Sequence, residues 1–87
     1  MIHRGQKASN ALLLSIQLVA LPGDRLTAEV NDQLVECNKT VLAFGSRELC
    51  ELQRQLLLDN QEKNPSFYAD ALKHIEVLFS ERFSEAA

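Results

Sequence analysis

The chain has 87 residues, of which 46% are hydrophobic, and it carries a net charge of −3 at pH 7. This length suffices for one domain with a single small core, and we predict one domain over residues 1–87. The acidic balance argues against nucleic-acid binding, for which a basic contact face would be expected. Apolar content beyond what a small core can hide is typical of chains that associate with a partner.

Residues 1–8 are polar, and we expect them to be flexible. An apolar run over residues 11–21 follows, and Ser9 or Asn10 is suited to cap it as a helix. The run is apolar on almost all sides, so such a helix must be covered on more than one face. Polar residues interrupt it, and it is far shorter than the roughly 20 residues of a membrane span. We therefore predict no transmembrane segment, no signal peptide and a cytoplasmic protein.

The segment from Asp24 to Phe44 organises the rest of the chain. After the break at Pro22, we predict that Gly23 takes a positive φ and that Asp24 caps a helix. Apolar residues recur along this helix at steps of three and four, which is the period of one buried stripe. They are Leu26, Val30, Leu34, Cys37, Val41 and Phe44. A second interpretation makes 11–21 and 25–37 two strands of a hairpin, although Pro-Gly favours a turn that suits hairpins poorly.

Two further helices have clear start signals. We expect Gly45 to end the organising helix in the left-handed conformation, and Ser46 to cap a helix over 47–61. Asn64 is placed to cap a fourth helix over 65–84, with proline at its first position. The expected inward rows are Leu49, Leu52 and Leu56 on the third helix and Tyr68, Leu72, Ile75 and Phe79 on the fourth.

Short connections between four helices favour antiparallel neighbours. We therefore predict an all-α fold, namely an antiparallel up-and-down bundle of three to four helices completed by dimerisation around the first helix. Residues 85–87 are expected to be flexible, like residues 1–8.

The chain offers few residues that could support catalysis. Asp70 and His74 stand four residues apart, a spacing that fits a general-base pair and also the much commoner surface ion pair. Cys37 and Cys50 occupy apolar helical positions at different heights, which predicts two free thiols. No close Cys or His pair suggests a metal site, and the isolated glycines form no phosphate-binding loop. We predict no enzyme activity, no metal and no cofactor.

Two polar residues have alternative interpretations. Gln53 borders the buried row of its helix, either as a boundary glutamine in water or as a buried amide that fixes register across an interface. Tyr68 opens the fourth helix, either packed under the preceding loop or as an exposed aromatic handle for a partner.

The stretch Ser-Arg-Glu-Leu-Cys-Glu-Leu-Gln at 46–53 resembles a segment of the phasins, small amphipathic helical proteins that coat polyhydroxyalkanoate granules. The resemblance covers about residues 25–85, including the helix before this stretch and the aromatic-containing helix after it. It implies binding to a hydrophobic granule surface. The chain departs from the phasin pattern in lacking an alanine-rich tail and in the break at Asn64-Pro65.

We therefore predict a non-catalytic interaction protein that uses an apolar helix face, is a homodimer and binds a granule surface in the manner of a phasin. The alternative is a small bacterial chaperone or assembly subunit, similar to those of type III secretion systems, that binds one protein partner. A small enzyme is the third hypothesis. The residues expected to form the interaction surface are Leu14, Leu18, Leu26, Val30, Leu34, Leu49, Leu52, Gln53, Leu56 and Tyr68.

Overall fold

The computed structural model describes residues 4–84, and that part of the chain is helical without any strand. Its elements are α1 (Arg4–Val19), η1 (Gly23–Arg25), α2 (Ala28–Phe44), α3 (Arg47–Asn60), η2 (Gln61–Lys63) and α4 (Pro65–Phe83), where η1 and η2 are single 3₁₀ turns. The predicted all-α fold is confirmed. The alternative hairpin over 11–21 and 25–37 is wrong, because both segments are helical for most of their length.

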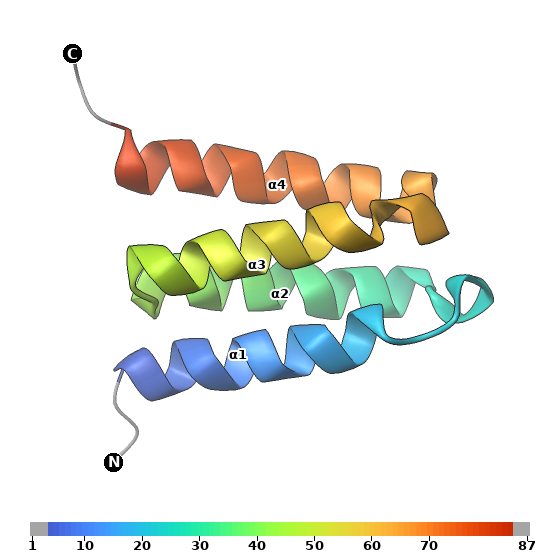
Figure 1. Ribbon diagram of the computed structural model, residues 1–87, viewed down its shortest axis with the longest axis horizontal. Coiled ribbons are helices and arrows are strands. Elements are labelled where there is room, and N and C mark those ends of the chain that lie inside the picture. The colour runs from blue at the N-terminus through green and yellow to red at the C-terminus, as the bar shows by residue number, and fades with distance from the viewer. Residues whose placement is uncertain (1–3, 85–87) are drawn as a thin grey trace.

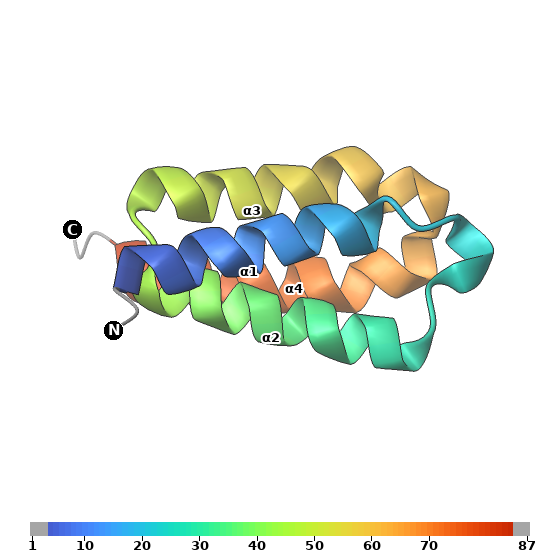
Figure 2. The same ribbon diagram turned by 90° about the horizontal axis from the view of Figure 1, so that it is seen from below.

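The four helices pack against one another around a common core. In Figure 1, α1 and α4 lie at opposite edges with α2 and α3 between them, and Figure 2 shows α2 and α3 at opposite edges after a quarter turn. Each helix thus has two close neighbours: α1 and α4 both pack against α2 and α3. The two ends of the described chain lie at the same end of the molecule (Figure 1).

Capping side chains explain where three of the helices begin. Ser46 Oγ accepts a hydrogen bond from the backbone N–H of Leu49, and Asn64 Oδ1 accepts one from Phe67, as predicted for α3 and α4. The prediction for α2 is wrong, because its cap is Thr27, whose Oγ1 accepts from the N–H of Val30. Asp24 instead lies inside the turn η1, which ends before α2 can start.

The first helix begins earlier than its polar sequence suggests. It starts at Arg4, before the predicted cap at Ser9 or Asn10, and Ala8 is fully buried. Residues 4–8 of the segment predicted to be flexible are thus helical, and their flexibility stays a prediction. Residues 1–3 and 85–87, the remainder of that prediction, lie outside the described residues.

Gly45 is required by space and not by backbone conformation. Its φ of −81° and ψ of 158° are extended, so the predicted left-handed stop is wrong, as is the positive φ predicted for Gly23. The N–H of Gly45 donates to Val41 O at 2.8 Å, and a Cβ on this residue would lie 2.6 Å from the same oxygen and 3.3 Å from the Cβ of Ala8. Glycine here lets the α2–α3 connection close against α1.

The two connections at the other end of the bundle are tied together. The Lys63 ammonium donates to the carbonyl of Val19 at the end of α1, and Asn64 Nδ2 donates to Gly23 O at 3.3 Å. A Cβ on Gly23 would lie 2.9 Å from Lys63 O, so glycine permits this close approach. Asn64 therefore caps α4 and also holds the α1–α2 connection against it.

Side chains from all four helices form one core. Its fully buried large apolar side chains come from α2, α3 and α4, and Leu18 and Val19 close it from α1. The buried members are Leu18, Val19, Leu34, Cys37, Val41, Leu42, Cys50, Leu57, Tyr68, Ala71 and Ile75. The predicted stripe of α2 is confirmed at its centre, Leu34 to Val41, and lies at the edge of the core at Leu26 and Val30.

The contrast between two glycines gives a testable prediction for this packing. We expect Gly45→Ala to lower the free energy of unfolding by about 1–3 kcal/mol, because its Cβ would overlap Val41 O. Gly5→Ala is the matched control: a Cβ added there would meet no atom within 4 Å, and alanine favours the helix by about 0.5–1 kcal/mol. Urea unfolding followed by circular dichroism measures both. A Gly45→Ala variant as stable as Gly5→Ala would contradict this packing.

Candidate interaction surface

A buried polar network joins the four helices at the centre of the bundle. Gln53 Nε2 on α3 donates to Ser15 Oγ on α1 at 2.8 Å and to Asn38 Oδ1 on α2 at 2.9 Å. Asn38 Nδ2 in turn donates to the carbonyl of Ala71 on α4 at 3.2 Å, and Ser15 Oγ donates to Ala11 O. Ser15, Asn38 and Gln53 are all fully buried. The interpretation of Gln53 as a boundary residue in water is wrong: it lies in the core and contacts two other helices.

The burial of Gln53 determines which side of α3 faces inward. The buried row is Cys50, Gln53 and Leu57, which follow one another at the helical spacing of three and four. The predicted row is one residue out of phase with it. Leu52 is therefore 52% exposed, whereas Leu49 and Leu56 lie partly buried at the edge of the core.

The structure divides the predicted interaction residues into three groups. Leu18, Leu34, Gln53 and Tyr68 are buried in the core of the chain, so they present no surface. Tyr68 is packed, with its ring edge against Phe67 at a centroid distance of 4.9 Å, and is not an exposed handle. Leu26, Val30, Leu49 and Leu56 are partly buried against the core. Only Leu14 and Leu52 are well exposed, at 43% and 52%.

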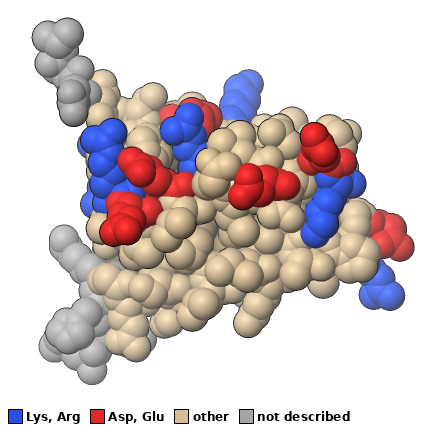
Figure 3. All heavy atoms as spheres, viewed as in Figure 1, with Lys and Arg blue, Asp and Glu red and all other residues tan. Residues whose placement is uncertain are grey.

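Large apolar side chains gather on the outward side of α1 and the adjacent edge of α3. Leu13 is 58% exposed and Ile16 is 45% exposed, and they join Leu14 and Leu52 on this surface. We call these four residues the α1 face. Along the lower edge of Figure 3, where α1 lies, no charged side chain is visible on the described surface. The α1 face is therefore an exposed group of apolar side chains with carboxylates at the edges of its grooves. Exposed apolar patches with a polar rim mark interaction sites.

The exposure of Leu13 follows from a signal that apolar periodicity alone does not reveal. Leu13 stands two residues before the buried Ser15, and two residues turn a helix by about 200°. Once Ser15 is known to face the core, Leu13 must therefore face away from it.

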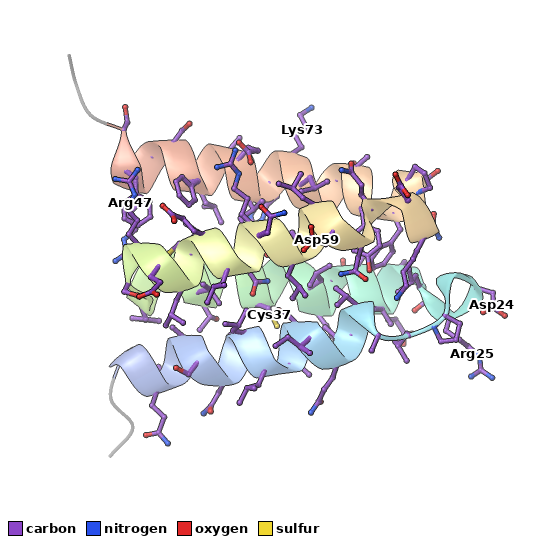
Figure 4. The ribbon with its side chains drawn as sticks, in the orientation of Figure 1. Asp24, Arg25, Cys37, Arg47, Asp59 and Lys73 are labelled. Atoms are coloured by element: carbon purple, nitrogen blue, oxygen red, sulfur yellow. The ribbon has the colours of Figure 1, made fainter. Side chains whose placement is uncertain are left out.

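Two shallow grooves flank the ridge formed by α1. The groove between α1 and α2 is floored by Ala11, Leu14 and Cys37, with Asp32 and Glu36 among its polar rim. Figure 4 shows Cys37 between α2 and α1.

The hollow between α1 and α3 is also largely apolar. It is lined by Leu12, Ile16, Leu52 and Leu56, with Asp59 at its edge. Helices pack when the side-chain ridges of one helix fit into the grooves of another. The α1 ridge with a groove on each side therefore has a shape into which a partner helix could pack.

Two arginines outside the α1 face make contacts that join neighbouring helices. Arg54 on α3 pairs with Glu76 on α4, and its guanidinium lies 5.3 Å from the ring centroid of Phe79. Arg82 on α4 donates to the carbonyl of Leu42 on α2 at 2.7 Å. These charges help to join the helices on the side of the bundle away from α1.

The pair of residues considered for catalysis is not assembled. Within residues 4–84, no hydrogen bond or ion pair joins Asp70 and His74. Partial burial of the imidazole and the ammonium of Lys39 lower the pKa of His74, and Glu36 opposes them. The imidazole is thus favoured in its neutral form, and this effect stabilises the fold above the unfolded pKa of about 6.5 and is lost as the pH falls through the lower folded pKa.

Both cysteines are free and buried. Burial raises the pKa of the Cys37 and Cys50 thiols, and for Cys50 this outweighs the opposing effect of the Arg82 guanidinium. Cys50 Sγ donates to Val41 O at 3.4 Å. A protonated, buried thiol is a weak nucleophile, so these residues act as small core side chains.

No group of three or more His, Cys, Asp or Glu side chains within the described range is placed to hold a metal ion. Among the same residues, no helix has both the length and the apolar composition needed to cross a membrane. Comparisons with protein-family models, curated proteins and solved structures found no match for this chain. The resemblance to phasins therefore stays a prediction.

Replacing Gln53 tests the buried network. We expect Gln53→Met to lower the free energy of unfolding by about 1–3 kcal/mol, because it leaves the Asn38 amide oxygen buried without a donor. The control is Gln55→Met, two residues away on the exposed side of α3, which should change stability by less than about 0.5 kcal/mol. Denaturant unfolding measures both, and equal effects of the two substitutions would refute the buried network.

Proposed function

We propose that this protein is a non-catalytic helical interaction protein that binds through the α1 face. The observation that carries the proposal is the exposure of Leu13, Leu14, Ile16 and Leu52 along α1 and the adjacent edge of α3. The core does not need these side chains, since α1 already contributes Ala8, Leu18 and Val19 to the interior. Each exposed leucine would be stabilised by burial, at about 25 cal/mol per Å² of apolar surface.

Two features of the fold support the part of the proposal in which successive helices alternate in direction, as in an up-and-down bundle, and the exposed apolar side chains of α1 support its completion by dimerisation. Its connections are short, and the two connections joined by Lys63 and Asn64 lie at one end of the molecule, opposite to the two termini of the described chain (Figure 1). In such a bundle α1 is an outer helix whose free side is available to a partner. A cytoplasmic location is part of this proposal, and the two free thiols are in keeping with it.

The shape of the surface favours a protein partner over a granule. The α1 ridge, the apolar groove toward α2 and the hollow toward α3 form a relief into which the side chains of another helix can fit. A granule surface imposes no such shape, so phasin-like coating would not depend on the grooves. A partner-binding protein of the chaperone or assembly-subunit type is therefore the better supported of the two interaction hypotheses.

Capture from a lysate of the cells that produce the protein tests this proposal. We expect wild type to retain binding partners that Leu13→Glu loses at least tenfold, because a carboxylate at the centre of the α1 face cannot be buried unpaired. Val77→Glu is the matched control: Val77 is also a large apolar residue, 51% exposed, but lies on α4. Quantitative mass spectrometry of the captured material, separated by density beforehand, provides the measurement.

The density of the captured material distinguishes the hypotheses. One stoichiometric protein in the soluble fraction supports the chaperone or assembly subunit, whereas recovery in a light, polyester-rich fraction supports phasin-like coating. If Leu13→Glu and Val77→Glu retain the same material as wild type, the α1 face is not the binding surface.

A further inference from the structure

We infer that the side of the α1 face that borders α2, with Leu14 and the α1–α2 groove, is covered by a second copy of this chain, with the two α1 helices antiparallel across a two-fold axis. The inference rests on the proposed function, because it names the partner of the same surface. It is carried by the distribution of charge beside α1, which makes the surface complementary to itself in one orientation only.

The basic side of this surface lies at the beginning of α1. Arg4 and Lys7 are the only charged residues before Asp24 in the sequence. The Lys7 ammonium lies 5.1 Å from the ring centroid of Phe44, so it is held at the end of the bundle where α2 finishes. This end of the α1–α2 groove is therefore positively charged.

The acidic side of the same groove lies toward the other end. Asn38 on α2 is level with Ser15 on α1, since both contact Gln53. Asp32 stands six residues before Asn38 and faces the later half of α1, because the α1–α2 connection joins the end of α1 to the start of α2 (Figure 1). Asp32 forms no hydrogen bond or ion pair with another residue of 4–84, so its charge is available to a partner.

Lys7 and Asp32 lie at about equal distances from the level of Leu14, on opposite sides of it along the axis of α1. Lys7 is about 10 Å before the level of Leu14 along the helix axis, and Asp32 is about 10 Å beyond it, taking a rise of about 1.5 Å per residue. Lys7 lies on the α1 side of the α1–α2 groove and Asp32 on its α2 side. A two-fold axis that passes through this groove at the level of Leu14, perpendicular to α1, therefore brings Lys7 of each copy to Asp32 of the other. It also sets the apolar groove with Leu14 against its counterpart.

A parallel arrangement of the two helices lacks this complementarity. It would bring Lys7 of one copy to the basic end of the other copy and Asp32 to the acidic end, so like charges would meet on both sides. The apolar surface alone allows either orientation, whereas the charges favour the antiparallel one. A two-fold contact of this kind is isologous and closes as a dimer.

Sedimentation equilibrium of the purified protein at low ionic strength tests the contact. We expect wild type to form dimers at micromolar concentration, and Leu14→Glu to weaken the dissociation constant at least about 100-fold, because Leu14 lines the groove at the two-fold axis. The control Val77→Glu should remain within about threefold of wild type. Leu14→Ser provides a second, milder variant at the same exposed position, and circular dichroism verifies that each variant is folded.

A charge exchange tests the orientation. Lys7→Glu and Asp32→Lys should each weaken association about 3–10-fold, because each places like charges together across the contact. The double variant Lys7→Glu/Asp32→Lys should recover to within about threefold of wild type, since the two attractive pairs are restored with reversed sign. Added salt should reduce the change in the dissociation constant caused by each of these variants, because it screens the charges.

The outcomes separate this inference from the proposed function. A wild-type protein that stays monomeric at about 100 μM, or dimers that Leu14→Glu leaves intact, would overturn the self-association through the α1–α2 groove. A double variant no tighter than the two single variants would overturn the antiparallel arrangement. If self-association fails while capture from lysate still depends on Leu13, the proposed function stands and the occupant is a different protein.

Discussion

The hydrogen bonds of Gln53 are the constraint on which the arrangement of the helices depends. One amide group on α3 reaches Ser15 on α1 and Asn38 on α2, and Asn38 continues the connection to the backbone of α4. Hydrophobic burial drives the helices together but is not directional, whereas buried polar groups must meet specific partners. The network thus selects one rotation and one height for each helix among the many that an apolar core allows.

The exposed surface follows from this internal constraint. With Gln53 turned inward, Leu52 has to face outward, and with Ser15 turned inward, Leu13 has to face outward. Polar residues thus occupy interior positions on α1 and α3, and apolar residues close to them in the sequence are exposed on the surface. A chain selected only for a stable monomer would gain from the reverse placement, which is why we connect the exposed leucines with binding.

Local signals in the sequence suffice to predict where most of the helices lie, but not which side of each helix faces the core. The starts of α3 and α4 were predictable because Ser46 and Asn64 satisfy backbone donors a few residues away. The start of α2 was not, since Asp24 and Thr27 are both good caps and the turn η1 decides between them. The inward side of α3 was beyond local periodicity, because the partners of Gln53 lie 38 and 15 residues away in the chain.

The most direct test of the polar core is hydrogen exchange of side-chain amides, followed by nuclear magnetic resonance. The Gln53 and Asn38 side-chain amide protons should exchange as slowly as the backbone amides of the core, because only unfolding exposes them. The side-chain amide of Gln61, which lies exposed in η2 away from α1, should exchange at the rate of a free amide. Exchange of the Gln53 amide as fast as that of Gln61 would contradict the network and the helix orientations derived from it.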